Sequence, residues 1–299
     1  MSIIDTPAKT SAGSASTPPT TFRRGRRGGR SWVRFVVVLL LVVEIYPMIW
    51  MFLTSLKSND DYLNNSTWSL PTTWEWGNYT DAWTTGHIGL YVQNSLLAVL
   101  PALALMLLLG TAAGFALQIM VWKGRSLTLL IFLAGMMVPP QMILLPLFTV
   151  YFQTGLSGTL WPLILTYTGT GLPLTVFMMA TYYRGVPREL FEAATIDGAG
   201  ILRAFWTISL PLVRNALLTV GLVQFFFIWN DLLIALTFTN GQDLRTIQVG
   251  LLNFTGDFGA TQYGPLFAAI CINVFGTLLI YLFLNQKVMK GLTSGAVKG

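Results

Sequence analysis

The 299-residue sequence is poor in charge, cysteine and histidine, and each shortage excludes a class of function. Charged residues make up 10% of the chain, against about 25% in soluble domains, so most of the protein does not face water. The single cysteine and single histidine exclude a disulfide within the chain and argue against a metal cage or a Ser-His-Asp triad. No G-x-x-x-x-G-K-[ST] loop occurs. We therefore expect no catalytic residue, no metal ligand and no cofactor bound by this chain.

Apolar residues are abundant instead, at 54% of the sequence. Six apolar segments reach the roughly 20 residues that cross a bilayer as a helix. These segments are 34–56, 91–120, 127–152, 159–182, 211–238 and 264–285. We predict an all-α polytopic membrane protein with a six-span domain over residues 32–285. Seven prolines interrupt or border the segments, which suits a bundle that lines a pathway; they are Pro47, Pro101, Pro139, Pro140, Pro146, Pro162 and Pro173.

The basic residues predict the orientation of the spans. With the N-terminus in the cytoplasm, only Lys57 and Arg245 of the 18 lysines and arginines fall outside. This positive-inside bias predicts that both termini are cytoplasmic, with residues 286–299 as a tail. Residues 1–31 are rich in small and polar residues and then in arginine, and we expect them to be disordered. The net charge of +6 therefore indicates a partner in membrane lipid rather than nucleic acid.

The stretch around which the chain is organised is the cytoplasmic loop 187–211, which is too polar to span a bilayer. Its first part predicts a short helix with Pro187 in the first turn. Asp197-Gly198 should end this helix, because glycine takes the positive φ that a tight reversal needs. A second helical run follows until Pro211 opens the next apolar segment, with Ile201, Leu202, Phe205 and Ile208 on one face.

This loop resembles the EAA loop of bacterial ATP-binding-cassette (ABC) importer permeases. The matching positions are Glu192-Ala193-Ala194, Asp197-Gly198-Ala199, Phe205, Ile208, Leu210 and Pro211. The resemblance implies a type I ABC importer permease fold, in which the loop is a coupling helix that docks into a cleft on the cytoplasmic ATPase. The docking residues that it implies are Glu192, Ala193, Ala194, Asp197, Gly198, Ala199 and Phe205. The alternative is an ordinary amphipathic connecting helix.

Three further stretches are similar to carbohydrate importers, in particular to the six-span second permease of the maltose/maltodextrin type. They are Ser55-Leu56-Lys57 and residues 245–251 and 291–299. The resemblance implies a non-catalytic permease of the bacterial cell membrane that moves a sugar, in particular a di- or oligosaccharide, into the cytoplasm. Its implied partners are a second permease, two ATPase subunits that bind ATP and Mg, and an extracytoplasmic sugar-binding protein. The extension before residue 31 has no counterpart in the family.

Polar side chains inside the predicted spans are candidates for a substrate pathway. They are Gln224, Trp229, Asn230, Asp231 and Asn273. In Trp229-Asn230-Asp231 an aromatic ring stands beside two polar groups, which is a common way to hold a sugar. For each residue alone, a hydrogen bond between helices is the alternative. Glu44 is the one acidic residue deep in a span.

Two other classes of function remain as alternatives. A secondary transporter driven by an ion gradient would use Glu44 and Asp231 as a relay and would need no docking loop. Such carriers often contain two repeated halves, and the sequence shows none. A membrane-embedded glycosyltransferase would need carboxylates at a membrane face, and Asp60-Asp61 is the only paired candidate.

Overall fold

The computed structural model describes residues 27–254 and 261–296, with side chains placed over 32–254 and 261–283. Residues 1–26 of the predicted disordered segment lie outside the described residues, whereas helix α1 already begins at Arg27. The helices and helical turns are α1 (Arg27–Ser55), α2 (Asn59–Asn64), α3 (Gly77–Trp83), α4 (Ile88–Gln118), α5 (Arg125–Gly135), α6 (Pro140–Gln153), α7 (Trp161–Tyr183), α8 (Glu189–Ile196), α9 (Ile201–Ala204), the π-helical turn η1 (Phe205–Ser209), α10 (Leu210–Trp229), α11 (Leu233–Phe238), the 3₁₀ turn η2 (Gln242–Leu244), α12 (Ile247–Gly250), the 3₁₀ turn η3 (Leu251–Phe254) and α13 (Tyr263–Ala296).

The described helices contain five segments long and apolar enough to cross a membrane, and a sixth if one bent pair counts as a single span. The five are Trp32–Ser55, Ile88–Gln118, Trp161–Tyr183, Ile201–Trp229 and Tyr263–Phe283. The predicted all-helical membrane fold is therefore confirmed. The chain divides into two compact units, Met1–Met48 and Ile49–Gly299. The described part of the first unit is the N-terminal portion of α1. The second unit holds every site discussed below.

The predicted third span, 127–152, is not one straight helix. It forms α5 and α6, which are bent by 93° at a short break. The cause lies in Pro139-Pro140, because two consecutive prolines remove two backbone donors and the residue before a proline avoids helical backbone. Pro139 is extended, at φ −65° and ψ 126°, and Pro140 opens α6. Pro47, Pro101, Pro146 and Pro173 lie within helices that continue past them.

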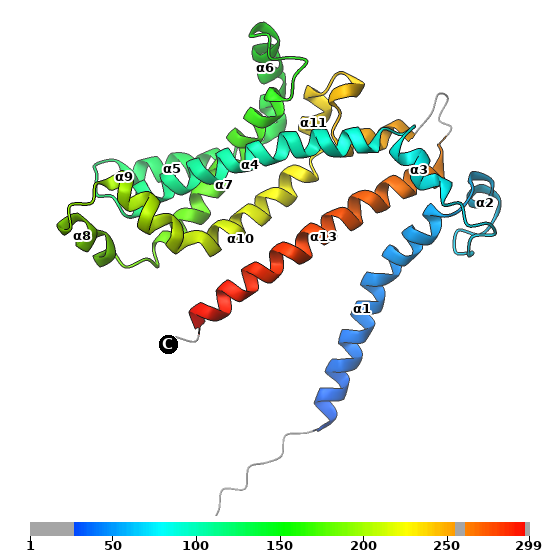
Figure 1. Ribbon diagram of the computed structural model, residues 1–299, viewed down its shortest axis with the longest axis horizontal. Helices are drawn as coiled ribbons and strands as arrows, with labels where there is room; N and C mark the ends of the chain where they lie inside the picture. The colour runs from blue at the N-terminus through cyan, green and yellow to red at the C-terminus, as the bar shows by residue number, and fades with distance from the viewer. Residues whose placement is uncertain (1–26, 255–260, 297–299) are drawn as a thin grey trace, which may run out of the picture. The chain divides into compact units, whose positions relative to one another are not determined.

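Helices α4, α7 and α10 run side by side and form the centre of the second unit (Figure 1). Gly110 and Gly114 on α4 form a Gly-x-x-x-Gly face against α7. A Cβ on Gly110 would lie 2.4 Å from the Thr175 methyl, and one on Gly114 would lie 2.9 Å from Met179 Cβ. Such small residues let two helix backbones approach closely in lipid, where the hydrophobic effect does not drive helices together. The two glycines of α4 therefore specify the close contact with α7, because they carry no side chain there.

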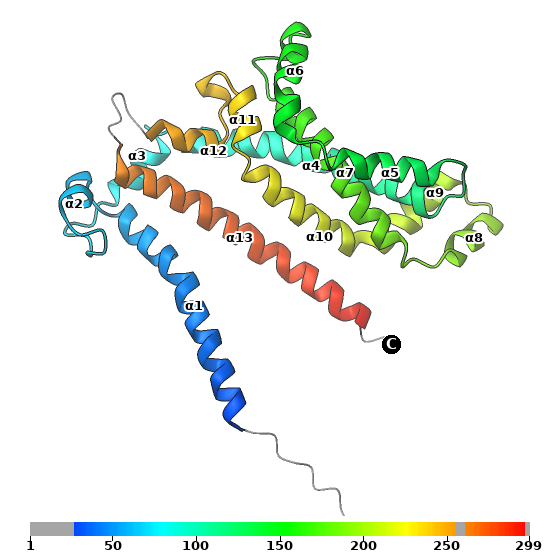
Figure 2. The same ribbon diagram turned by 180° about the vertical axis from the view of Figure 1, so that it is seen from behind.

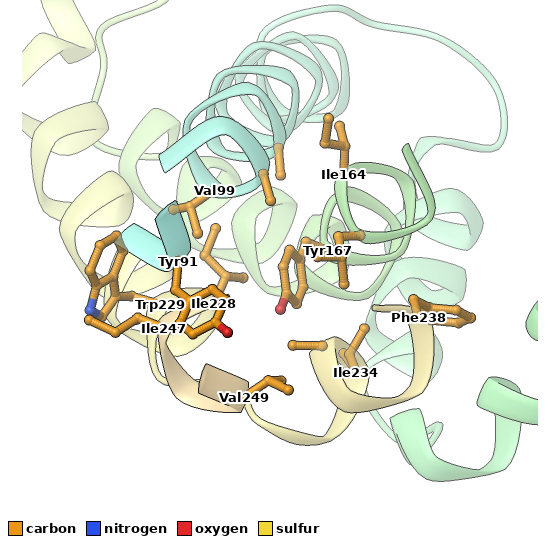
Figure 3. Packing of buried hydrophobic residues seen from close by; sticks show 14 of the residues in the cluster. Tyr91, Val99, Ile164, Tyr167, Ile228, Trp229, Ile234, Phe238, Ile247 and Val249 are labelled. Atoms are coloured by element: carbon orange, nitrogen blue, oxygen red, sulfur yellow. The ribbon is translucent and has the colours of Figure 1, made fainter. Parts of the chain in front are cut away.

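The group α4, α7 and α10 has short helices at both ends. Figure 2 shows α8 and α9 at one end, and α3 and α12 near the other, as Figure 1 also does. The second end contains a cluster of buried residues from α4, α7, α10, α11 and α12 (Figure 3). Its labelled members include Tyr91, Tyr167 and Trp229, whose rings fill the space between the helices.

Candidate functional site

Helix α8 ends in a turn that requires a glycine. Gly198 has φ +77°, as the sequence predicts, and the Gly198 N–H donates to the Thr195 carbonyl at 3.0 Å. The next N–H, of Ala199, donates back to the Ala194 carbonyl at 2.8 Å. This pair of bonds is the Schellman arrangement, which satisfies carbonyls that a helix end would otherwise leave free. The turn reverses the chain so that α9 can begin two residues later.

The inner face of α8 packs on an aromatic cluster at the ends of the long helices. Phe115 of α4 is its centre, with ring centroids 5.5 Å from Phe191, 5.9 Å from Tyr183 and 5.4 Å from Phe205. All three contacts are edge-to-face, the geometry that the ring quadrupoles favour. The Tyr183 and Ser209 hydroxyls are hydrogen-bonded to each other within the same region. Through Phe191, helix α8 is thereby attached to a cluster that α4, α7 and η1 share.

An arginine just before α8 strengthens this attachment. One Arg188 guanidinium nitrogen lies 2.8 Å from the Gln118 carbonyl oxygen, which is at the C-terminal end of α4. A helix C-terminus presents free carbonyls and partial negative charge, so a cation is favourable there. The connection between α7 and α8 is therefore held to α4 by a polar contact in addition to the aromatic cluster.

The outer face of α8 and α9 is exposed and largely apolar. Ile196 is 86% exposed and Leu202 is 73% exposed, and Leu190, Ile201 and Trp206 are also exposed. Glu192, Ala193 and Asp197 of the loop are exposed as well. Exposed apolar residues bordered by polar ones are typical of surfaces that bind another protein.

Two of the predicted docking residues face the inside of this chain instead. Ala194 is 7% exposed and Phe205 is 6% exposed, because both pack toward the cluster around Phe115. The prediction treated all seven motif residues alike, whereas the 3.6-residue period of a helix places some of them on its inner side. Glu192, Ala193, Asp197 and Gly198 are exposed, and Ala199 is partly exposed.

The helix of the fifth span begins before Pro211. It starts at Ile201 and runs through η1 into α10, which ends at Trp229, whereas the predicted apolar segment is 211–238. In η1 the Leu210 N–H donates to the Phe205 carbonyl, five residues back. Pro211 has no N–H and follows directly, so the wider π-helical turn lets the helix pass this proline without ending. The predicted second helical run of the loop is thus continuous with the helix of the fifth span.

Three of the predicted pathway residues connect helices to one another. The Gln224 amide donates to the Gly171 carbonyl and to Thr175 Oγ1, both at 2.8 Å, and so joins α10 to α7. The Trp229 indole N–H donates to Asn273 Oδ1 at 3.0 Å and so joins α10 to α13. Trp229 and Asn273 are buried against each other. For these residues the structure contains the helix-to-helix hydrogen bonds that the sequence left as the alternative.

Asp231 lies beyond the end of α10 and lines a cavity of 280 Å³. One of its carboxylate oxygens accepts hydrogen bonds from the Tyr167 hydroxyl and from the Ala235 N–H, both at 3.0 Å. Gln224 lines the same cavity, which lies next to the break between α5 and α6. Asn230 is exposed, and its amide donates to the Phe226 carbonyl at 3.0 Å. The five predicted residues therefore do not form one site.

The acidic pair Asp60-Asp61 has a local structural role at Asp61. Its carboxylate accepts hydrogen bonds from the Asn65 amide at 2.6 Å and from the Thr72 N–H at 2.9 Å. The hydrogen bond from Asn65 is the main cause that lowers the pKa of Asp61 below its ordinary value, and the bond from Thr72 is the next. Asp61 is buried while Asp60 is exposed. A carboxylate kept ionised and already bonded in this way is suited to fixing the α2 loop rather than to acid–base chemistry.

The residues that sequence reasoning missed are the aromatic ones beneath the loop, Phe115, Tyr183 and Phe191. The sequence did contain a signal for one of them. Phe191 and Ala194 are three residues apart, which places them on one face of a helix, and both are buried. Phe115 could not be found in this way, because it lies some 76 positions earlier than Phe191 on another helix.

Comparison with known proteins gives one consistent result. The family model described as "Binding-protein-dependent transport system inner membrane component" matches residues 106–286. A diacetylchitobiose uptake system permease protein of Streptomyces coelicolor is 34% identical over 264 residues, which cover 88% of this chain and 87% of the relative. A melibiose/raffinose/stachyose import permease protein of Bacillus subtilis is 30% identical over 271 residues, which cover 89% of this chain and 97% of the relative.

A solved structure supports the fold independently. It is the crystal structure of a bacterial ABC transporter involved in the import of the acidic polysaccharide alginate. The TM-score is 0.75 at 18% identity, and the match covers 90% of this chain and 99% of the other. The family model spans more than half of the chain, and the relatives align along most of their lengths. The chain belongs to the family of binding-protein-dependent transport system inner membrane components.

Proposed function

We propose that this chain is the transmembrane permease subunit of an ABC importer that moves a sugar or oligosaccharide into the cytoplasm. The observation that carries the proposal is α8, a short helix that is fixed to the long helices on one side and presents an exposed apolar surface on the other. Family membership and the sugar-importing relatives support the same function.

The exposed face of α8 and α9 docks on an ATPase subunit in this proposal. Glu192, Ala193, Asp197 and Gly198 contact the ATPase, together with the exposed apolar residues Ile196 and Leu202. Ala194 and Phe205 act indirectly, because they hold α8 against the chain's own core. ATP and Mg bind to the ATPase subunits and not to this chain.

Coupling then follows from rigid attachment. When ATP closes the ATPase dimer, α8 moves with the cleft that holds it. The contacts of Phe115 with Phe191, Tyr183 and Phe205 transmit this displacement to α4, α7 and the start of the fifth span. The spans thereby change from an inward-facing to an outward-facing arrangement, and the binding protein releases sugar into the opened cavity.

The remaining partners and the orientation are inferred from the family and from the positive-inside rule. The importer contains a second permease subunit, two ATPase subunits and an extracytoplasmic sugar-binding protein, in a bacterial cell membrane. Both termini and α8 face the cytoplasm, and the turns around α3 and α12 face outward. The side chains of the C-terminal tail, 286–299, lie outside the described residues.

A substrate pathway in this subunit would pass the cavity that Gln224 and Asp231 line. Trp229 and Asn273 support the pathway as a packed pair rather than as sugar ligands, because the Trp229 indole N–H is already bonded to Asn273 Oδ1. A secondary transporter would require Asp231 to exchange ions freely. The two hydrogen bonds that Asp231 accepts from Tyr167 and Ala235 favour a fixed position instead.

The proposal is tested by purifying the assembled complex and measuring its ATPase activity with binding proteins loaded with diacetylchitobiose, melibiose or maltose. We expect at least one loaded binding protein to stimulate ATP hydrolysis above the level with the same protein unloaded. The proposal would be contradicted if no ATPase subunit is recovered with the complex. It would also be contradicted if the rate of ATP hydrolysis is the same with every loaded binding protein as with the unloaded one.

A further inference from the structure

A second cavity, of 670 Å³, lies at the end of the helix group α4, α7 and α10 that is opposite α8. There α3, α4 and the start of α13 meet the η2 and η3 turns. We call it the outer cavity, and the cavity beside Asp231 the inner cavity. Its lining differs in character from that of the inner cavity beside Asp231. Polar side chains of several kinds surround it: Asp81, Thr85, His87, Gln242, Asn253 and Gln262. The set offers a carboxylate, a hydroxyl, an imidazole and three amides.

Most of these polar groups are free to bind a ligand. In the described part of the chain, the side chains of Asp81, Thr85, His87, Gln242 and Gln262 make no hydrogen bond to another residue. The first three come from the end of α3 and the turn into α4, whereas Gln242 begins η2 and Gln262 directly precedes α13. Three separate parts of the chain therefore supply donors and acceptors to the cavity.

The wall that carries Asn253 is held rigidly. The Asn253 amide donates to the Tyr91 hydroxyl at 2.6 Å, and its carbonyl oxygen accepts from Arg245. The Asn94 amide donates to the Asp243 and Arg245 carbonyls at 2.7 and 3.1 Å. These bonds attach η2 and η3 to α4, so the cavity does not depend on a loose loop for this side.

The turn that leads into α4 contains an unusual backbone position. His87, the residue before α4, has φ 55°, and it is the one non-glycine residue with positive φ among those described. This conformation is uncommon for a residue with a Cβ, and strained positions concentrate at binding sites. It places the imidazole at the cavity lining rather than continuing the helix.

Size and charge select the class of ligand. Small-molecule sites usually have volumes of about 300–1,000 Å³. The outer cavity, at 670 Å³, falls within this range, and the inner cavity, at 280 Å³, falls just below it. Among the residues that the structure describes, no lysine or arginine lines the outer cavity, and Asp81 would repel an anion. Neutral, hydroxyl-rich ligands match a lining of one carboxylate, amides and a hydroxyl, because each hydroxyl both donates and accepts.

We propose that the outer cavity is an entry site that binds the sugar after the binding protein releases it and before it reaches the spans. The proposal rests on the proposed function and on the orientation that places α3 and α12 outside. It adds a sugar-binding role for this subunit at residues that are not among the predicted pathway residues.

A cysteine-protection experiment tests occupancy directly in the assembled transporter. Cys271 is the chain's only cysteine and is fully buried, so an introduced cysteine supplies the new signal. Thr85→Cys lies in the lining, and its neighbour Thr84→Cys is exposed but not in the lining, which makes it the matched control. Each variant is treated with a membrane-impermeant maleimide, and the mass of this chain is measured. The sugar is the member of the diacetylchitobiose, melibiose and maltose panel that the complex imports.

We expect the free sugar, without binding protein, to slow labelling of Thr85→Cys in a saturable way and to leave Thr84→Cys unaffected. Equal labelling of Thr85→Cys with and without sugar would overturn the proposal. Protection by the unloaded binding protein but not by sugar would also overturn it, because the cavity would then be a protein contact. If the complex imports no sugar of the panel, the proposed substrate class fails first and this proposal fails with it.

A transport measurement separates a sugar site from a docking site. Asp81→Ala should reduce sugar uptake about fivefold, the effect of losing one hydrogen bond of about 1 kcal/mol, while ATP hydrolysis stimulated by the binding protein stays unchanged. Asp60→Ala, in the same outer loop but away from the cavity, should change neither rate. If Asp81→Ala lowers uptake and stimulated hydrolysis by the same factor, or lowers neither, the entry site is refuted.

Discussion

Substitutions at Gly198 separate backbone strain from contact with a partner. Gly198 has φ +77°, and no atom lies within 4 Å of the Cβ that a side chain would add. Gly198→Ala therefore meets no clash within this chain and costs only the strain of a left-handed residue, about 1–2 kcal/mol. Asparagine and aspartate tolerate this backbone region better than alanine. If the turn only connects two helices, alanine should be the most damaging of the three.

Docking on an ATPase predicts the opposite order. A side chain at Gly198 would then enter the interface, and an unpaired buried charge there costs about 2–5 kcal/mol, more than the strain that alanine introduces. We expect transport to fall in the order wild type, Glu192→Ala, Gly198→Ala, Gly198→Asp, because Glu192 lies at the exposed rim. Gly198→Asn should fall between Gly198→Ala and Gly198→Asp.

The assay for this series measures recovery of the ATPase with each purified variant, together with uptake of the sugar. Membrane levels of the permease provide the control for folding. The expected result is normal insertion, with loss of ATPase recovery that follows the size and charge of the side chain at Gly198. Undiminished ATPase recovery and uptake in Gly198→Asp would refute the docking role. An order in which Gly198→Ala is worse than Gly198→Asn would show that strain alone matters.

Four further outcomes are expected. Reporter fusions after residues 60 and 250 should be extracytoplasmic and those after 123, 195 and 299 cytoplasmic, and cytoplasmic activity at 60 would contradict the six-span topology. Glu44→Gln should keep transport nearly intact, because an amide can still hydrogen-bond; loss of transport in a normally assembled complex would indicate a proton relay. Phe115→Ala should lose about 3–5 kcal/mol of packing free energy beneath α8 and uncouple ATP hydrolysis from uptake. Phe152→Ala, at an exposed residue of α6, should leave the two rates coupled. Coupled transport in Phe115→Ala would contradict the aromatic connection. Gly114→Leu should lower the thermal stability of the purified complex, because the added side chain separates α4 from α7. Gly276→Leu should be tolerated, because no atom lies within 4 Å of the added Cβ. Equal stability of the two variants would argue against the close α4–α7 contact.

The sequence predicted the features that depend on local chemistry. The apolar segments gave the spans because a helix of about 20 apolar residues is needed to cross a bilayer. Gly198 was assigned a positive φ because the helix pattern stops there and glycine adopts that backbone freely. The family to which the loop pointed was confirmed for the chain by the family model and the relatives.

Features that depend on contacts between distant segments were not predicted. The direction of α6 after Pro139-Pro140 and the course of the helix through Pro211 both depend on how a proline is accommodated in three dimensions. The burial of Phe205 depends on Phe115, which lies on another helix. Trp229 and Asn273 look like two separate polar candidates in the sequence, and only the packing of α10 on α13 pairs them.

The central claim is that this chain imports a sugar at the expense of ATP hydrolysed by partner subunits. The most direct measurement is sugar uptake into liposomes that contain the assembled complex, with loaded binding protein outside and ATP with Mg inside. We predict uptake that requires both ATP and the binding protein and that continues when ionophores collapse the proton and sodium gradients. Uptake that persists without ATP and stops with the ionophores would contradict the claim and identify a gradient-driven carrier.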